Sequence, residues 1–444
     1  MSANSESKNK LISTAQQILE FARKAGATSA EVDIGTGNGL SVTARMGDVE
    51  TIEHQRDKGL SVTVYLDKQK GNASTTDFSG AAVEAAVQAA CTIARNAGAD
   101  EYSGLIDPQY QSADIPDLDL YYPWEISPEQ AIEVVIDCES TARQADVRIN
   151  NSDGATLNTY SGTHVYGNSN GFVGGWDWSS HSIDCTVIAE QDGHMQRDGW
   201  YTKARDRKDL EQYRDVALEA ARRTVSRLGA HKLSTRSIPV IYEAPVASGL
   251  FSSFISAVSG GAQYRKASFL LNKLDQQVFA PHIHIYEDPH IPRGIGSVPF
   301  DNDGMTTRKR ELITEGILRG YVLSAYSARK LGMEPTGNAG GVHNLIVEAG
   351  AKDLNGLIKE MGTGLLITEL IGFGVNLITG DYSRGATGLW IENGEIQYPV
   401  EEITVAGNLA DIFKHIVEVG NDVDRRKNIR TGSVLVDSMM VAGS

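Results

Sequence analysis

Histidines and carboxylates gather in one short stretch of the sequence, "HIHIYEDPH", which runs from His282 to His290. On a strand, His282 and His284 would point to one face, as ligands do in several metal sites. Glu287, Asp288 and His290 follow closely, so this stretch is a candidate metal site. The alternative is a polar strand face that runs into a proline turn. None of the ten histidines begins an H-E-x-x-H or H-E-x-x-x-H pattern.

Two glycine-containing motifs resemble catalytic or cofactor loops. "GNSNG", Gly167 to Gly171, matches the G-x-S-x-G pattern of a nucleophile elbow, which needs a strand, a tight turn and then a helix. The residues that follow read as strands, so we interpret it as a hairpin turn. "GTGNG", Gly35 to Gly39, lacks the last glycine spacing of a dinucleotide loop and leads into a strand. We predict a turn there as well.

Two further glycine-rich stretches are candidate binding loops. "YSARKLGMEPTGNAGGVHN" contains Gly337, Asn338 and His343, and "TGDYSRGATG" contains Arg384. Because glycine has no side chain, the backbone of such loops can approach an extended chain closely. Arg384 could bind a carboxylate or a backbone carbonyl. The alternative is that both stretches are ordinary surface loops.

One predicted helix is chemically blank. In "PVASGLFSSFISAVSGGAQYRKASF", Pro245 to Phe269, apolar residues recur at helical spacing, and Pro245 suits a first helical position. Gly260 and Gly261 suit the end of the helix. From Pro245 through Gln263 the sequence has no acid, base, histidine or cysteine.

The composition limits the classes of function. The chain has 444 residues, which predicts two or three domains, and its net charge of −16 opposes binding to nucleic acid or an anionic membrane. The three cysteines, Cys91, Cys138 and Cys185, lie far apart and form no CxxC pair, as expected for free thiols. The first residues form no apolar signal, and no apolar run approaches 18 residues. We therefore expect a cytoplasmic protein.

The pattern of elements predicts an α+β protein, because strands dominate and do not alternate one-to-one with helices. Residues 1–100 read as helix, antiparallel meander and helix, with Ser79 as an N-cap. Residues 101–127 read as a crossing segment, and residues 128–235 repeat the helix–meander–helix plan, which indicates a duplication. Residues 236–444 form a strand-rich domain with packed helices, including a hairpin turn at Asn393-Gly394 and a helix over residues 408–420.

Several long blocks, taken together, resemble one known family. They are "GGAQYRKASFL", "FDNDGM", "GYVLSAYSARKLGMEPTGNAGGVHN", "GDYSRGATGLWIENGEIQYPVEEITVAGNL" and "GNDVDRRKNIRTGSVLVDSMMVAG". They are similar to the TldD/PmbA family, and within it to the PmbA (TldE) branch. The resemblance covers nearly the whole chain, and many blocks in the same order are more specific than any single motif above.

The resemblance implies a metallopeptidase assembly. In the TldD branch, a helix carries H-E-x-x-x-H and a cysteine near the C-terminus completes the zinc site. Residues 236–444 would be equivalent to the metallopeptidase domain of that partner. Here the corresponding helix, from Val246 to Val258, offers no such ligand, and all cysteines precede residue 186. We therefore expect no cofactor and no catalytic residue in this chain, and zinc in the partner subunit.

Two functions follow from these expectations. The first is the non-zinc-binding subunit of a peptidase that cleaves unfolded peptides, in a heterodimer with a zinc-bearing TldD-like subunit. The candidate contacts to a peptide channel or to the partner are Tyr264, Arg265, Lys266, Gly337, Asn338, His343 and Arg384. The second is a stand-alone homodimeric binding or regulatory protein without peptidase activity. The family has also been labelled a modulator of DNA gyrase, but the acidic charge opposes direct contact with DNA.

Overall fold

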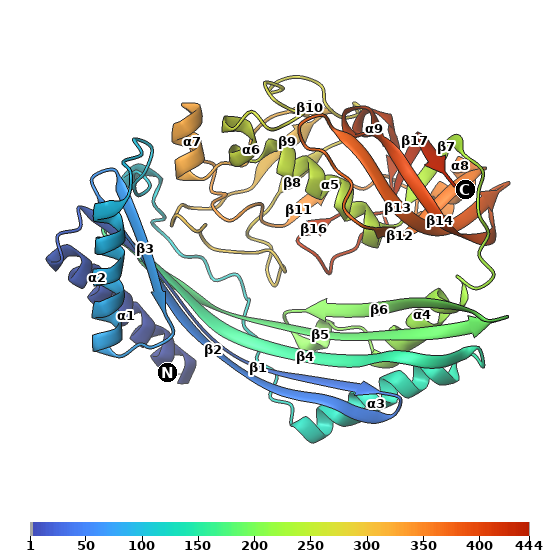
Figure 1. Ribbon diagram of the computed structural model, residues 1–444, viewed down its shortest axis with the longest axis horizontal. Coiled ribbons are helices and arrows are strands. Elements are labelled where there is room, and N and C mark those ends of the chain that lie inside the picture. The colour runs from blue at the N-terminus through green and yellow to red at the C-terminus, as the bar shows by residue number, and fades with distance from the viewer. Residues whose placement is uncertain (1–2, 444) are drawn as a thin grey trace.

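The computed structural model describes residues 3–443, in which a long curved sheet lies opposite a strand-rich C-terminal unit (Figure 1). The sheet and its helices are built from the first half of the chain. The second unit contains two further sheets and several short helices. The α+β class expected from the sequence is confirmed.

The first half of the chain repeats one order of elements, a helix followed by three strands and a second helix. This order confirms the plan predicted from the sequence. The first set is α1 (Ala3–Lys24), β1 (Ser29–Arg45), β2 (Asp48–Leu66), β3 (Gln69–Thr75) and α2 (Gly80–Asn96). The second set is α3 (Pro128–Gln144), β4 (Ile149–Asn168), β5 (Val173–Gln191), β6 (His194–Ala204) and α4 (Tyr213–Val225), with short 3-10 turns at Pro108–Tyr110 and Arg207–Asp209.

The two sets form a single sheet rather than two. Its strand order is β3-β2-β1-β4-β5-β6, so the halves meet where β1 pairs antiparallel with β4. This pairing runs from Glu31 opposite Asn168 to Ala44 opposite Ala155. Each half alone would expose the backbone donors and acceptors of a long edge strand, and joining the halves satisfies these groups.

The length of β1 corrects the prediction of a turn at Gly35 to Gly39. These residues lie inside the strand, and a Cβ at Gly37 or Gly39 would collide with the ring of Tyr160 on the neighbouring strand. Glycine is needed there because a side chain approaches the backbone, rather than because the chain reverses. The reversal comes at Met46-Gly47, where both φ angles are positive, at 55° and 86°.

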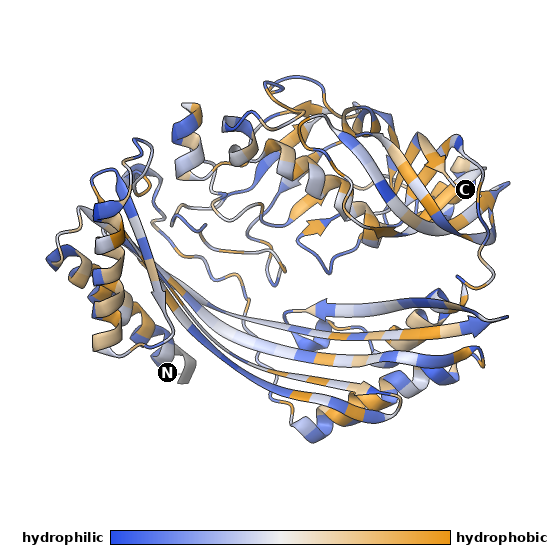
Figure 2. Ribbon diagram, in the orientation of Figure 1, coloured by the Kyte–Doolittle hydropathy of each residue, from blue (hydrophilic) through white to orange (hydrophobic). Residues whose placement is uncertain are grey.

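Helices cover one face of the sheet at its two ends. Buried residues of β1 alternate and so share a face, with Val32 in the core beneath α1 and α2 and Val42 in the core beneath α3 and α4. Between these cores the strands are pale in a hydropathy colouring, whereas their ends are more apolar (Figure 2). The middle of the opposite face carries polar and aromatic side chains such as Tyr160 and His164.

The C-terminal unit is centred on a closed ring of strands. The pairings run β14-β13-β12-β7-β17, and β14 also pairs with β17. The second sheet has the order β10-β9-β8-β11-β16. The strands are β7 (Arg236–Tyr242), β8 (Ile285–Glu287), β9 (Arg310–Thr314), β10 (Ile317–Leu318), β11 (Leu345–Val347), β12 (Gly364–Ile371), β13 (Asp381–Glu392), β14 (Glu395–Asn408), β15 (Ile416–Val419), β16 (Ile429–Arg430) and β17 (Val434–Ala442). The helices are α5 (Ala244–Val258), α6 (Gly260–Tyr264), α7 (Ala325–Leu331), α8 (Leu354–Met361) and α9 (Leu409–Ile412), with a 3-10 turn at Phe413–His415.

Two local predictions in this unit are wrong. The helix expected over residues 408–420 ends early, and Ile416 and Val419 instead pair with β17, where β-branched side chains fit a buried strand. Gly260 and Gly261 do not end α5 in a left-handed turn. The cap is Ser259, in an extended conformation. Ser259 is also the N-cap of a new helix, α6, because its hydroxyl accepts a hydrogen bond from the Ala262 amide.

Candidate functional site

Helix α5, the blank helix of the sequence, is a packing element of the C-terminal core. Phe251 and Phe254 are fully buried, and the ring of Phe254 lies edge-on to that of Phe279 at 5.1 Å. The serine hydroxyls are used within the helix, because Ser253 donates to the Gly249 carbonyl at 3.1 Å and Ser256 to the turn before it. The helix therefore offers apolar surface and serine hydroxyls, and no imidazole, thiol or carboxylate that would bind a metal.

The other candidate metal ligands do not converge either. Within residues 3–443 there is no group of three or more histidine, cysteine, aspartate or glutamate side chains arranged to hold a metal ion. His282 and His284 precede β8, whereas the imidazole of His290 forms a hydrogen bond with the Thr307 hydroxyl at 3.0 Å. The three cysteines are free and buried in the first unit. The residues present do not fit a catalytic zinc ion.

The glycine loop at residues 337–341 is anchored from beneath by a buried carboxylate. Asn338 is 4% exposed, and its amide donates to both Glu287 oxygens, at 2.9 and 3.0 Å. The His343 backbone N–H also donates to Glu287, at 3.1 Å, and the Arg310 guanidinium pairs with it at 2.6 Å. Asn338 therefore holds the loop in place. Gly337 has a φ of +77°, a conformation that other residues rarely adopt.

The remaining residues expected to touch peptide or partner lie on two different parts of this unit. Tyr264 is the last residue of α6 and Arg265 follows it, with the Arg265 guanidinium over the Tyr264 ring at 5.3 Å. Tyr264 also contacts Tyr326 of α7 edge-on. Lys266 comes next, with a φ of 56°. Arg384, on β13, reaches toward Gly249 of α5, and its buried Nε has no hydrogen-bond partner among the described residues. Burial lowers the pKa of His343, the last residue of this set, below its ordinary value.

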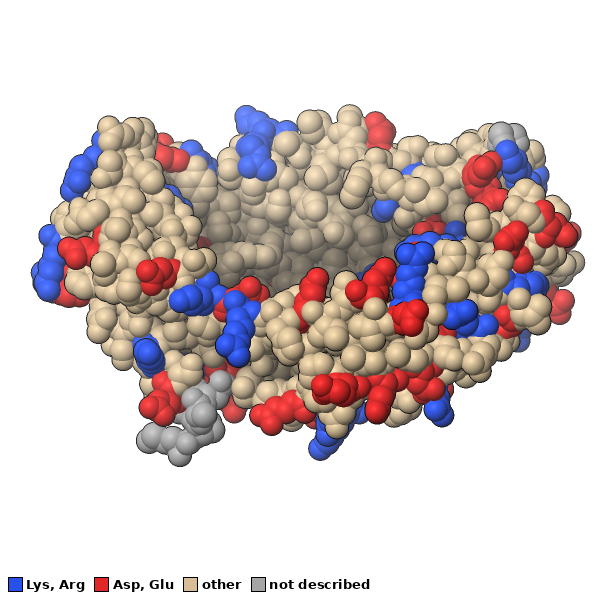
Figure 3. Space-filling model, turned by 60° about the horizontal axis from the view of Figure 1, so that its bottom comes forward, with Lys and Arg blue, Asp and Glu red and all other residues tan. Residues whose placement is uncertain are grey.

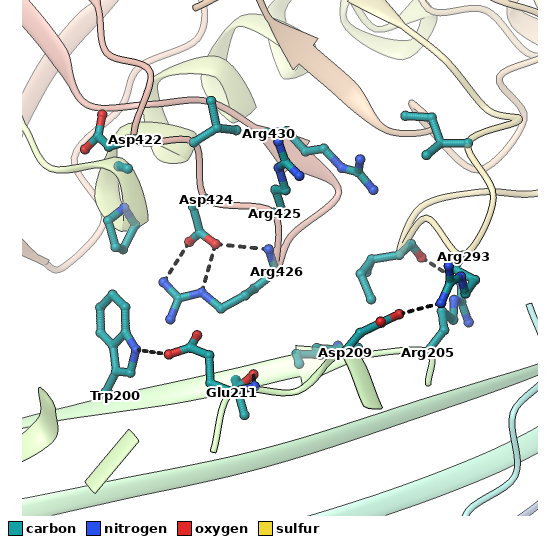
Figure 4. A pocket seen from close by; sticks show the side chains of 18 of the residues that line it. Trp200, Arg205, Asp209, Glu211, Arg293, Asp422, Asp424, Arg425, Arg426 and Arg430 are labelled. Carbon is teal, nitrogen blue, oxygen red and sulfur yellow. Dashed lines mark hydrogen bonds and ion pairs between the residues drawn. The ribbon is translucent and has the colours of Figure 1, made fainter. Parts of the chain in front are cut away.

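Sequence reasoning missed a cavity of about 750 Å³ between the first sheet and the C-terminal unit (Figure 4). The cavity is lined by β6 and the segment that follows it, and by the loop that precedes β16. Ala244 and Pro245, at the amino end of α5, also line it. The charged residues that line it are Lys203, Arg205, Asp209, Glu211, Glu243, Arg293, Asp422, Asp424, Arg425, Arg426 and Arg430. The only trace in the sequence was a pair of charge-rich runs, "KARDRKD" and "NDVDRRKNIR".

Part of this charge forms ion pairs across the cavity wall. Asp424 accepts two hydrogen bonds from the Arg426 guanidinium, at 2.8 and 3.1 Å, and this guanidinium also lies 4.0 Å from the centre of the Trp200 ring. Asp209 pairs with Arg293 at 3.0 Å. The Asp209–Arg293 pair and the contact of Arg426 with Trp200 join the first sheet and its connecting segment to the C-terminal unit, whereas the Asp424–Arg426 pair lies within one loop.

The molecule also has a wide depression on the face shown in Figure 3. A space-filling view shows a wide hollow in the middle of the molecule, with a largely uncharged interior and charged side chains on its rim (Figure 3). A second concavity of about 440 Å³ shares Lys203, Arg205 and Ile295 with the cavity and continues to Trp176 and Trp178 on β5. The arrangement suits an elongated ligand better than a compact one, since the two concavities adjoin.

The residues that build the long sheet and those that build the closed strand ring all match the family models of one group of peptidases. Residues 30–94 match PmbA/TldA metallopeptidase domain 1, residues 121–228 match the central domain, and residues 235–443 match the C-terminal domain. The chain belongs to the PmbA/TldD family of metallopeptidases.

Individual relatives agree with this assignment. The chain is 48% identical to Metalloprotease PmbA of Escherichia coli O157:H7, over 93% of this chain and 92% of that protein. A crystal structure from Bacteroides thetaiotaomicron, named as a candidate modulator of DNA gyrase, superimposes with a TM-score of 0.93 at 29% identity, over 97% of this chain and 98% of that one. The structure of TldE from Thermococcus kodakarensis shares the fold, with a TM-score of 0.86 at 21% identity, over 97% of this chain and all of that one.

The helices give no indication of a membrane span. Throughout residues 3–443, each helix is too short or too polar to cross a bilayer.

Proposed function

We propose that this chain is the non-catalytic subunit of a two-subunit metallopeptidase whose zinc-bearing subunit is a separate, TldD-like chain. The observation that supports this most directly is the chemistry of α5. The helix keeps its place in the core, yet its side chains are apolar or are serines, three of which donate to backbone carbonyls of the same helix. A zinc ion needs three or four nitrogen, sulfur or oxygen ligands, and the described residues gather no such set.

The role of the chain would be to hold peptide and stabilise the active partner. The hollow of Figure 3 lies in the middle of the molecule, and its mostly uncharged interior suits an extended substrate recognised by its backbone. The proposed contacts to the peptide or the partner are the loop at residues 337–341, the half-buried Tyr264, the exposed Arg265 and Lys266, and Arg384. The substrate would be an unfolded peptide, because recognition through the backbone needs an extended chain whose backbone groups are free.

The test compares the chain alone with the chain mixed with a zinc-bearing member of the family. An unstructured peptide serves as substrate, and a chelator identifies metal-dependent cleavage. We expect no cleavage by the chain alone, and cleavage in the mixture that the chelator abolishes. Chelator-sensitive cleavage by the chain alone would overturn the proposal.

Gel filtration of the same mixture separates the two functions considered above. A single heterodimer peak is expected for the peptidase subunit. If the chain elutes as a homodimer in the presence of the zinc-bearing subunit, the stand-alone binding or regulatory function is favoured instead.

A further inference from the structure

The cavity of Figure 4 contains arginines that form no ion pair with a carboxylate of residues 3–443. The Arg205 guanidinium donates to the backbone carbonyls of Ser179 at 3.1 Å, Gly294 at 3.4 Å and Ile295 at 2.7 Å. Among the described residues no carboxylate lies within ion-pairing distance of it. Burial lowers its pKa to about 10. A charge taken out of water without an opposite charge is costly, and carbonyl dipoles compensate for it only in part.

Arg430 and Arg425 add a second group of unneutralised charge. The nearest hydrogen-bond acceptor of Arg430 is the Asn344 side-chain oxygen, at 3.5 Å, and its Nε is buried without a partner. Burial, and after it the charge of Arg425, lower the pKa of Arg430, and the charge of Asp288, which is not within ion-pairing distance, opposes this only in part. Arg425 itself forms no ion pair within residues 3–443. Figure 4 shows both side chains projecting into the open part of the cavity.

The acidic residues of the cavity do not supply the missing partners. Asp424 and Asp209 are engaged with Arg426 and Arg293, as described above, and Glu243 pairs with Arg223 at 2.8 Å. Glu211 accepts from the Trp200 indole at 3.4 Å and Asp422 from the Ser433 hydroxyl at 2.6 Å. In Figure 4, Glu211 and Asp422 lie toward the left, whereas Arg425, Arg430 and Arg205 lie at the centre and right. The cavity thus has a basic side, in a chain whose net charge is −16.

We propose that the basic side of this cavity, formed by Arg205, Arg425 and Arg430, binds a carboxylate of an extended peptide. The planar guanidinium matches a carboxylate with two parallel hydrogen bonds, and Arg425 and Arg430 have these donors free. The carboxylate is either the peptide's C-terminus or an acidic side chain. That the ligand is a peptide rests on the proposed function; the need for an anion rests on the cavity alone.

The neighbouring concavity indicates where the rest of the peptide lies. Lys203 and Arg205 line both spaces, and the second contains Trp176 and Trp178, with the Arg205 guanidinium 6.0 Å from the centre of the Trp178 ring. Residues next to the bound carboxylate would therefore contact aromatic rings. Such rings accept apolar side chains with little selectivity.

Isothermal titration calorimetry on the full chain tests the proposal with three short, unstructured peptides of one sequence. The first ends in a free carboxylate, the second in an amide, and the third in an amide with glutamate as its last residue. We expect either carboxylate form to bind about tenfold or more tightly than the plain amide, as two charge-assisted hydrogen bonds would give. The overall charge of the chain predicts the opposite order, so the sign alone is informative.

Substitutions of the cavity arginines test whether the preference for carboxylate over amide arises in the cavity. R425A and R430Q should each reduce the ratio between carboxylate and amide to about threefold or less. R308A is the matched control, because Arg308 is also exposed and has no ion pair within the described part of the chain, but lies outside the cavity. It should keep the full ratio. Arg425 is exposed, so R425A serves as the test even if R430Q does not fold.

Preference for the first peptide identifies a C-terminal carboxylate, and equal binding of the third identifies any carboxylate; both support the proposal. Equal binding of acid and amide, absence of binding, or a ratio that survives in both variants would overturn it. The measurement needs no partner and no cleavage. Peptide cleavage by the chain alone would therefore refute the proposed function without affecting this result. Equal binding of acid and amide would refute the carboxylate site without affecting the proposed function.

Discussion

The carboxylate of Glu287 holds the glycine loop in place, so substituting Glu287 should destabilise that loop. Glu287 is 2% exposed and accepts hydrogen bonds from the Arg310 guanidinium and the His343 backbone N–H. The side-chain amide of Asn338 donates to both of its oxygens. The substitution E287A removes all of these acceptors at once. It leaves the Arg310 guanidinium, whose side chain is 12% exposed, with only the Tyr321 carbonyl, at 2.9 Å.

The size of the effect follows from this burial. Removing one partner of a buried ion pair costs about 3–5 kcal/mol, because the remaining charge stays buried without compensation. The unpaired amide of Asn338 adds to this cost. A whole protein is typically stable by only about 5–15 kcal/mol, so E287A should weaken the C-terminal unit severely. A change of 3 kcal/mol or more corresponds to about a hundredfold in an opening equilibrium.

Hydrogen exchange measured by mass spectrometry locates this change. In E287A, the amides of residues 337–345 and of the paired strands β8 and β11 should lose about a hundredfold or more of their protection. E311A is the control: Glu311 lies on the adjacent strand β9, is exposed, and has no side-chain partner within residues 3–443. It should change stability by less than about 0.5 kcal/mol.

The reasoning would be refuted if E287A lowered protection of the loop by less than about fivefold, or by no more than E311A. The double substitution of Glu287 by glutamine and Arg310 by methionine gives a second check. It removes both charges, so it should cost less than the sum of the two single changes. Additive costs would show that the two side chains are not energetically coupled.

Three further predictions concern other parts of the molecule. F254A should lower the free energy of unfolding of the C-terminal unit by about 3–5 kcal/mol in urea titrations, because it empties a fully buried aromatic site; a loss below about 1 kcal/mol would contradict the packing role of α5. Burial raises the pKa of Asp184 from 3.8 to about 6, so wild-type stability should fall as pH rises from about 4 to about 6, by about 2 kcal/mol from this residue. D184N should lack that part of the fall in thermal unfolding, and an unchanged pH profile would show that Asp184 does not cause it. Arg329 donates to the carbonyls of Tyr102, Gly104 and Leu105 at 2.7–3.0 Å, so R329A should expose this segment to limited proteolysis, whereas equal resistance would show that other contacts hold it.

Local features of the fold could be predicted from the sequence because their causes are local. Ser79 caps α2, accepting from the Ala82 amide as expected. Asn393 and Gly394, with φ angles of 54° and 75°, form the turn between β13 and β14. Helical periodicity also predicted α5, and the residue types of that stretch showed that it carries no metal ligand. These features depend on a few neighbouring residues, whose types set the backbone conformation directly.

Features that depend on distant residues were missed or misjudged. Gly37 reads as a turn residue until the ring of Tyr160 is known to cross over it, and that crossing requires β1 to pair with β4. Asn338 reads as a loop residue free to meet a peptide, yet Glu287, 51 positions away, binds its amide. Nothing in the local pattern encodes such pairings, because they arise from packing between elements.

The sequence by itself determined the class of the fold, the family, and the absence of zinc-ligating side chains on α5, because residue types and short spacings are sufficient for each. Only the tertiary structure decided that the two halves share one sheet, that Asn338 anchors its loop, and that Arg205, Arg425 and Arg430 face one cavity. The physical reason is that charge compensation and strand pairing depend on distance in space. Residues far apart along the chain acquire a common environment only when the chain has folded.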